Sequence, residues 1–331
     1  MKNIKALVGS IFFLLLVLNS CNDNIVNEEK YLSWNTVNNS TFIFSGYSSG
    51  INDITWGGNI GQEKFIAVGD EGQMAYSFDG NTWIAITDTT FGTSNILSIT
   101  WGNDIFLAGG RDGKISYSEN GINWTAVNLD DIFVTINCIS WGNNRFVAGG
   151  YFTYSGRMAY SFDGINWTLV TGDLFRDNPI NDITWGNNRF ISVGWYGNIA
   201  YSTDGINWTA VNVSSIFGNE ISSINGITWG NNRFVAVGRE GRIAYSANGI
   251  TWFLVVDSTF DTNLIQSVAW GNNKFIAASW NGLAYSSDAI NWINITENVI
   301  EGIWFNAIVW GNDKFVAGGR NGKIVYSDKY Y

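Results

Sequence analysis

Apolar and polar residues alternate with a period of two along most of the chain, and glycine, asparagine or aspartate interrupts the alternation at short intervals. Residues 224–255 read INGITWG, NN, RFVAVG, REG, RIAYS, ANGI and TWFLV in succession. Alternation of this period, bounded by turn residues, predicts short β-strands. The segment therefore predicts four antiparallel strands, whereas no stretch after the first 21 residues carries a sustained helical pattern.

Two series of tryptophans show that this unit is repeated seven times. The first series is spaced by 45, 40, 44, 44, 41 and 40 residues and comprises Trp56, Trp101, Trp141, Trp185, Trp229, Trp270 and Trp310. The second series comprises Trp34, Trp83, Trp124, Trp167, Trp208, Trp252 and Trp292. Four-stranded units repeated at about this period are typical of β-propellers. The sequence therefore predicts an all-β fold, a seven-bladed propeller over residues 31–331.

The two ends of the chain predict how the ring closes. The last unit ends in GKIVYSDKYY, after its third strand, and has no fourth. The stretch YLSWNTV, Tyr31–Val37, matches the fourth-strand pattern through Trp34 and Val37. We expect this N-terminal strand to pair with the C-terminal blade, because closure removes the exposed edges of an open sheet.

A short motif precedes each strand of the second tryptophan series, as in YSTDGINWT, Tyr201–Thr209. It is similar to the Asp box of sialidase-type, or BNR, repeat propellers, although the glycine directly follows the acid and makes the box one residue shorter. The resemblance covers nearly the whole mature chain and implies a structural turn away from the ligand. The residues agree, because Asn120 and Asn248 replace the aspartate in two copies. An Asx turn needs only a side-chain oxygen, whereas acid catalysis needs a carboxyl group.

No catalytic residue is assigned. The chain contains no histidine, which excludes Ser-His-Asp and Cys-His catalysis and histidine metal sites. The arginine triad, tyrosine nucleophile and acid of sialidases do not map onto this chain. Basic residues recur in register instead, which favours local pairing over one converging site; they are Lys64, Arg145, Arg189, Arg233, Lys274 and Lys314 in the first turns and Arg111, Arg239 and Arg320 in the second. No cofactor or metal is predicted.

The N-terminus reads as an export signal. Lys2 and Lys5 precede an apolar run from Ala6 to Leu18, which has the length of a signal-peptide core. LNSC then resembles the lipobox of bacterial lipoproteins and implies acylation of Cys21, with a plain secretory signal as the alternative. We expect residues 1–20 to be the signal, residues 21–30 a tether, and the protein to be exported and held at the membrane by its lipid alone.

The net charge and the cysteine content limit the kinds of partner and of bond that the sequence predicts. Without Lys2 and Lys5, 16 basic and 28 acidic residues leave a net charge of −12. Nucleic acid is therefore not an expected partner, because no basic excess neutralises phosphates. With Cys21 acylated, Cys138 has no disulfide partner, and its apolar surroundings predict a buried, inert thiol.

Candidate ligand-binding residues come from the face that varies between units, where the second turns and the linkers lie. Three tryptophans fall outside both series and map to this face, and four more aromatic residues lie in its turns; the candidates are Trp195, Tyr196, Trp280, Trp304, Tyr151, Phe152 and Tyr154. We expect Trp195 and Trp280 to flank one blade and to bind a sugar or an apolar loop. The alternative is that these aromatics only cover the blade tops, as expected for Phe91, Phe133, Phe175, Phe217 and Phe260.

The sequence predicts a binding or interaction module for a glycan or a protein. One alternative is a glycan hydrolase or lyase that uses carboxylates of the variable face, which needs two carboxyl groups at about 5–10 Å. The acids available there are Asp130, Asp131, Asp173, Asp177, Glu297 and Glu301. The other alternative is an assembly scaffold without a small ligand.

Overall fold

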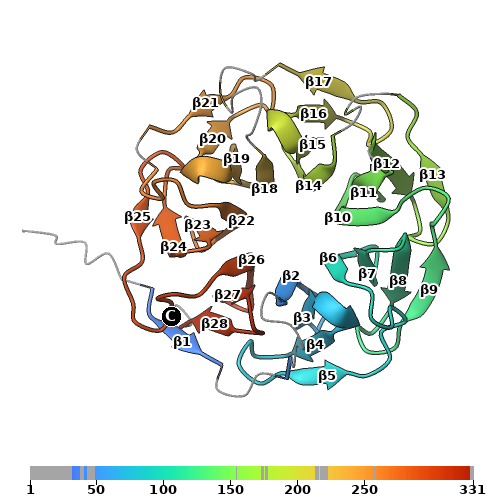
Figure 1. Cartoon of the computed structure of the whole chain (residues 1–331), viewed down its shortest axis with the longest axis horizontal. Helices are drawn as coiled ribbons and strands as arrows, with labels where there is room; N and C mark the ends of the chain where they lie inside the picture. Colours follow the sequence, from blue (N-terminus) through green and yellow to red (C-terminus); the bar gives the residue numbers. More distant parts are fainter. Residues whose placement is uncertain are drawn as a thin grey trace, which may run out of the picture. The chain divides into compact units, whose positions relative to one another are not determined.

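The computed structural model describes residues 32–37, 41–42, 49–153, 155–172, 175, 178–212, 216, 223–256 and 258–328. The chain divides into two units, Met1–Leu32 and Ser33–Tyr331. The second unit contains seven four-stranded antiparallel sheets arranged as the blades of a ring (Figure 1). The predicted seven-bladed β-propeller is therefore confirmed. The expected signal, Cys21 and the tether lie outside the described residues.

Each blade runs from an inner strand to an outer strand. The inner strands are β2 (Ile51–Gly57), β6 (Ile96–Gly102), β10 (Thr135–Gly142), β14 (Ile180–Gly186), β18 (Ile224–Gly230), β22 (Ile265–Gly271) and β26 (Phe305–Gly311). The second strands are β3 (Lys64–Gly69), β7 (Ile105–Gly110), β11 (Arg145–Phe152), β15 (Arg189–Gly194), β19 (Arg233–Gly238), β23 (Lys274–Ser279) and β27 (Lys314–Gly319). Blades are numbered 1 to 7 in this order.

The third strands are β4 (Met74–Ser77), β8 (Lys114–Ser118), β12 (Ser155–Ser161), β16 (Ile199–Ser202), β20 (Ile243–Ser246), β24 (Gly282–Ser286) and β28 (Ile324–Ser327). The outer strands are β5 (Ile84–Ile86), β9 (Thr125–Asn128), β13 (Trp167–Leu169), β17 (Thr209–Val211), β21 (Phe253–Leu254), β25 (Ile293–Asn294) and β1 (Trp34–Thr36). Three second turns form single 3₁₀ turns, namely η1 (Asp70–Gly72), η2 (Trp195–Gly197) and η3 (Arg239–Gly241).

Strand β1 closes the ring as the sequence predicts. It pairs antiparallel with β28, and Trp34 lies opposite Ser327 (Figure 1). The Trp34 side chain is buried, and its backbone N–H donates to Glu297 Oε2 at 2.9 Å. The N-terminal strand therefore completes blade 7, and the structure shows this pairing over a shorter range than the expected residues 31–37.

The inner strands contact one another through a tryptophan on one blade and a glycine on the preceding blade. A Cβ atom added to Gly186 would lie 2.2 Å from Trp229 Cγ, and equivalent contacts join Gly57 to Trp101 and Gly311 to Trp56. Each of these tryptophans also packs on a phenylalanine of its own blade, as Trp185 does on Phe190 at 4.6 Å between ring centroids. The first tryptophan series therefore forms the joints between inner strands.

The face opposite the variable one is built from repeated turns. The first turns of blades 3 to 6 hold two asparagines with positive φ, for example 45° at Asn143 and 55° at Asn144, which suits a two-residue hairpin. In the predicted Asx turns, Asp204 Oδ1 accepts from the N–H groups of Ile206 and Asn207, and Asn248 Oδ1 accepts the equivalent pair. The YSTDGINWT motif is a structural turn here, as predicted.

The basic residues of the first turns pair locally, also as predicted. Lys64 Nζ donates to the carbonyl of Asn120 in the next blade at 2.7 Å, and Arg233 Nη1 donates to that of Asp288 at 2.9 Å. Lys314 links blade 7 to blade 1 through the Asp79 carbonyl. These cations tie neighbouring blades together and do not converge on one ligand.

Carboxylates and hydroxyls make a further set of contacts between blades. Asp53 Oδ2 accepts the Ile99 N–H and Asp182 Oδ2 accepts the Ile227 N–H, both at 2.8 Å. Ser98 Oγ accepts the equivalent N–H in the next blade at 2.9 Å. Desolvation in the wall of the ring raises the pKa of each of these two aspartates to about 7, although the hydrogen bonds that they accept lower it. The charge of Asp53 further raises the pKa of Asp182.

The described linker phenylalanines and Cys138 are buried, as the sequence predicts. The linker phenylalanines Phe91, Phe133, Phe175 and Phe260 are buried, whereas Phe217 lies outside the described residues. Cys138 is buried, its thiol donates to the Gly149 carbonyl, and desolvation raises its pKa. The prediction of an inert thiol agrees with this position.

Replacement of Gly186 by alanine tests the joint between inner strands. The new methyl group would overlap Trp229, whose ring is held by Phe234, so overpacking should cost about 1–3 kcal/mol. Thermal unfolding of the purified 31–331 fragment should show a lower midpoint. Gly92→Asn is the control, because Gly92 has φ 61° and open space around it, and should unfold like the parent.

Stability should fall as pH rises from about 4 to 7. The folded pKa of Asp53 and of Asp182 lies above the unfolded value, so their contribution is complete below the unfolded pKa and is lost as pH passes the folded one. The slope is at most about 1.4 kcal/mol per pH unit for each group. The double variant Asp53→Ser, Asp182→Ser places at both positions the serine that blade 2 has as Ser98. Its denaturant midpoint should change less with pH over this window than that of the parent. An unchanged slope in the double variant would assign the effect to other groups.

Candidate functional site

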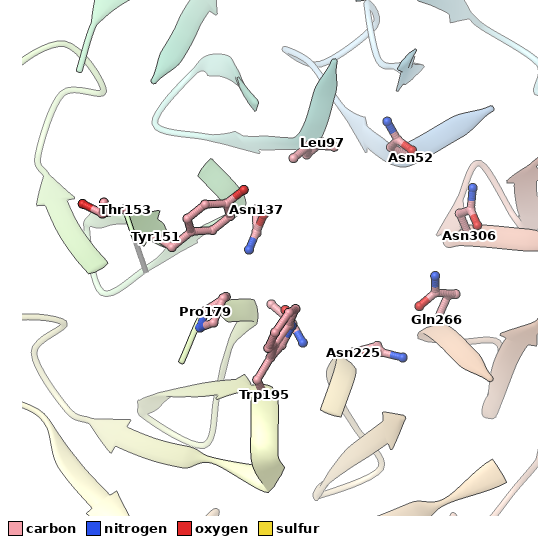
Figure 2. Close-up of a pocket in the computed structure, with 11 residues that line it drawn as sticks. Asn52, Leu97, Asn137, Tyr151, Thr153, Pro179, Trp195, Asn225, Gln266 and Asn306 are labelled. Atoms are coloured by element: carbon pink, nitrogen blue, oxygen red, sulfur yellow. The ribbon is translucent and has the colours of Figure 1, made fainter. Parts of the chain in front are cut away.

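A ring of carboxamide side chains lines the variable-face end of the central channel. Every inner strand has a register shift near its start, as between Ile51 and Asp53 or between Ile136 and Cys138. This β-bulge directs the extra side chain away from the ladder and toward the channel (Figure 2). We call the residues at this position the amide ring, although blade 2 contributes a leucine; they are Asn52, Leu97, Asn137, Asn181, Asn225, Gln266 and Asn306.

The orientation of these amides is set by the neighbouring blade. Asn137 Nδ2 donates to the Ile180 carbonyl at 2.7 Å and Asn306 Nδ2 donates to the Ile51 carbonyl at 2.9 Å. Asn52, Asn181 and Asn225 make the equivalent bond. Because a carbonyl accepts only, the NH₂ group must face it, and each side-chain oxygen then faces elsewhere. The amide ring therefore lines the channel with carboxamides whose remaining oxygen and N–H groups can accept and donate. Some of these groups are already used within the protein, since Asn52 Nδ2 also donates to Asp70 Oδ1 and Asn225 Oδ1 accepts from Ser223 Oγ.

A second ring of residues surrounds the first. In six blades the first residue of the second turn donates its backbone N–H to the residue that precedes the inner strand, as Trp195 does to Pro179 at 3.2 Å and Arg320 does to Trp304 at 3.0 Å. In blade 3 the corresponding residue, Tyr151, pairs with Thr135 instead. We call these the rim residues; they are Asp70, Arg111, Tyr151, Trp195, Arg239, Trp280 and Arg320.

A cavity of about 600 Å³ lies at this end of the channel, a size typical of small-molecule sites. Besides the amide ring, its walls consist of Tyr151, Thr153, Pro179 and Trp195. The indole of Trp195 rises from blade 4 beside the amides, and the phenol of Tyr151 extends toward Asn137 from blade 3 (Figure 2). Two of the predicted residues therefore meet at one cavity, and no acidic or basic side chain is among its described lining residues.

Tyr196 occupies a strained position beside Trp195. Its φ is 56° and its ψ is 30°, a left-handed conformation that costs an ordinary residue about 1–2 kcal/mol. Blades 1, 5 and 7 place Glu71, Glu240 and Asn321 in the same conformation. The Tyr196 ring is 45% exposed and meets Trp195 edge-on at 6.3 Å, so burial of the ring does not account for its place there.

Trp280 and Trp304 form a separate cluster between blades 6 and 7. Their rings are parallel within 7° and 4.9 Å apart. The Arg320 guanidinium lies 3.7 Å from the centroid of Trp304 and 5.4 Å from that of Trp280. Trp280 and Trp304 are not among the lining residues of the cavity that Trp195 faces. The structure thus brings Trp280 together with Trp304 and Arg320, and the expectation that it shares a site with Trp195 stays a prediction.

The remaining candidates lie away from the cavity or outside the described residues. Phe152 is half-buried at the end of β11, with the Arg157 guanidinium 5.5 Å from its ring. Tyr154 and the linker acids Asp173 and Asp177 are not described. Glu297 binds the Trp34 backbone and so serves ring closure.

The amide ring was not predicted from the sequence. The candidate residues were chosen because they differ between repeats, whereas asparagine recurs at the bulge position of five inner strands, as in INDITWG and FNAIVWG. The repeat itself therefore contained a signal. A polar residue recurs near the start of the inner strand, among apolar residues that the alternation predicts to be buried. Its meaning depends on the bulge, which the sequence does not mark.

Other classes of site find little support in the described part of the chain. No group of three or more acidic or cysteine side chains there is arranged to hold a metal ion. Likewise, none of the helices in that part has the length and apolar character needed to cross a membrane.

Known proteins share the fold of this chain. No protein-family model matches it, and no curated protein matches it in sequence. YCF48 from Cyanidioschyzon merolae is similar in structure, with 17% identity, a TM-score of 0.66, and coverage of 89% of this chain and 98% of that one.

A structure of YCF48 bound to D1 peptide gives 16% identity and a TM-score of 0.68 over 91% of this chain and 98% of the other. Virginiamycin B lyase from Staphylococcus aureus gives 14% identity and a TM-score of 0.69 over 90% and 99%. At these identities the likeness shows a shared β-propeller fold. The relation to sialidase-type Asp-box repeats stays a prediction.

Proposed function

We propose that this protein is an interaction module that binds a saccharide at the variable-face mouth of its central channel. The observation that carries the proposal is the amide ring, whose side chains line a cavity without charged lining among the described residues. Carboxamides both accept and donate hydrogen bonds, which suits a ligand rich in hydroxyl groups. Trp195 adds a flat apolar face beside them, as stacking on a sugar ring requires.

A peptide is the second candidate ligand. Backbone N–H groups would also suit the acceptors of the amide ring, and the structure of YCF48 bound to D1 peptide supports a protein partner for a propeller of this shape. A glycan hydrolase or lyase has less support, because no carboxylate is among the described lining residues of the cavity. An assembly scaffold, the other alternative, would give the cavity no role.

Trp195 should be essential for binding and dispensable for folding. Its side chain is 46% exposed at the cavity, so Trp195→Ala should leave the unfolding midpoint nearly unchanged. Loss of an aromatic anchor costs about 2 kcal/mol or more, which lowers affinity roughly 30-fold. A glycan array followed by calorimetry on residues 31–331 measures both. Binding by peptides and by no glycan would favour the second candidate, whereas unchanged binding in the variant would move the site elsewhere.

Tyr196→Asn separates a binding role from a structural one. Asparagine accepts the left-handed backbone better than tyrosine does, so stability should stay constant or rise by up to about 1 kcal/mol. Affinity for the same glycan should fall, because the aromatic edge beside Trp195 is lost. Asn321→Asp is the control at the equivalent turn. A destabilised Tyr196→Asn with intact affinity would assign Tyr196 to the fold.

The proposed place of action is the cell envelope of a bacterium, with the protein exported and anchored by a lipid on Cys21. The charged start, the apolar core and LNSC support this proposal. Cys21→Ala should block lipid attachment and release the protein from the membrane fraction, as metabolic labelling with a fatty acid and fractionation would show. Normal processing and membrane retention of this variant would contradict the lipoprotein assignment, and Cys138→Ala serves as the control.

A further inference from the structure

The arginine among the rim residues of blade 7 differs from the two other rim arginines. Arg111 and Arg239 are exposed and are each followed by an acid, Asp112 and Glu240. Arg320 is half-buried and is followed by Asn321. In the described part of the chain, no carboxylate pairs with the Arg320 guanidinium. A cation that has no carboxylate partner among the described residues is therefore held on the variable face of a protein whose formal net charge is −10.

The two indoles hold this guanidinium in a defined orientation. Arg320 Cζ lies 3.7 Å from the Trp304 centroid, close enough for a cation–π contact, and the parallel Trp280 ring supports Trp304. Stacking occupies the face of the guanidinium and leaves its N–H edge for hydrogen bonds. A planar guanidinium presents paired donors that match the two oxygens of a carboxylate.

The backbone of Arg320 lies beside two strands of the amide ring, whereas its side chain is not among the described lining residues of the cavity. Its backbone N–H bonds to the Trp304 carbonyl, two residues before Asn306, and it forms an antiparallel bridge with Gly50, two residues before Asn52. Two residues of strand span roughly 7 Å. A sugar ring that donates to Asn52 or Asn306 therefore has Arg320 within reach of a substituent that points outward.

We propose that Arg320, positioned by Trp304 and Trp280, binds the carboxylate of an acidic sugar whose ring occupies the mouth of the channel. The inference rests on the proposed saccharide function and adds the class of glycan, one that carries a uronic acid. It also gives Trp280 and Trp304 a role separate from that of Trp195: they support the cation on blade 7, whereas Trp195 faces the cavity from blade 4.

The test compares matched sugars on matched variants. Residues 31–331 are applied to an array of neutral hexose disaccharides and of the same disaccharides that end in the corresponding uronic acid or its uncharged amide. The uronic acids should bind roughly 10-fold more tightly than their neutral counterparts, and this preference should weaken with added salt. Arg320→Gln should abolish the preference while retaining affinity for neutral disaccharides. Arg320→Lys should restore only part of it, and Arg111→Gln, the control at the equivalent turn, should retain it.

The outcomes separate this inference from the function on which it rests. Binding of neutral disaccharides with no preference for the acids would overturn the role of Arg320 and leave the saccharide function standing. An acid preference that survives Arg320→Gln, or that Arg111→Gln removes equally, would overturn the role too. If no disaccharide binds although circular dichroism shows that the protein sample is folded, both the role of Arg320 and the saccharide function are overturned.

Discussion

The propeller depends on a contact between the backbone of one inner strand and the indole of the next. A glycine ends each inner strand, and the tryptophan of the following blade lies where the glycine Cβ would be. The contact recurs at all seven joints, including the one from Gly311 to Trp56 that joins the last blade to the first. Because every blade contacts only its neighbours, the ring is stabilised by repetition of this one interface. The polar bonds between blades, from Lys64 or Asp53 for example, are added to it.

The amide ring follows from the same repetition. A uniform joint brings equivalent residues of seven inner strands together, and the bulge then turns one side chain of each strand inward. Five asparagines of this ring bind the next blade through their NH₂ groups, and all five also line the cavity. The fold and the proposed binding surface therefore use the same residues, and in this proposal specificity comes from the rim, whose residues differ between blades.

Backbone strain distinguishes the two faces. Ala289 adopts a φ of 65° in an Asx turn where the other copies have glycine, but its side chain is buried in a core cluster, which offsets the cost. Tyr196 has a similar φ on the variable face, and its ring is largely exposed. A residue held in an unfavourable conformation without compensating burial is more often retained for function than for stability. Because Glu71 and Glu240 have a similar φ at the equivalent turns, this backbone belongs to the repeat, and the exposed aromatic ring of Tyr196 is the feature particular to blade 4.

The sequence by itself determined the number of blades, their four strands, the closure by Trp34 and the structural role of the aspartate turns, because each depends on local periodicity and on repetition within one chain. It also predicted Trp195 and Tyr151 as candidates because they differ from the repeat, and both line the cavity. The amide ring and the partner of Arg320 were decided only by the tertiary structure. A β-bulge changes the direction of one side chain without a marker in the sequence, and the stack of Trp280, Trp304 and Arg320 joins residues of two blades. Both depend on how neighbouring blades are packed, and the order of residues within one repeat does not encode that packing.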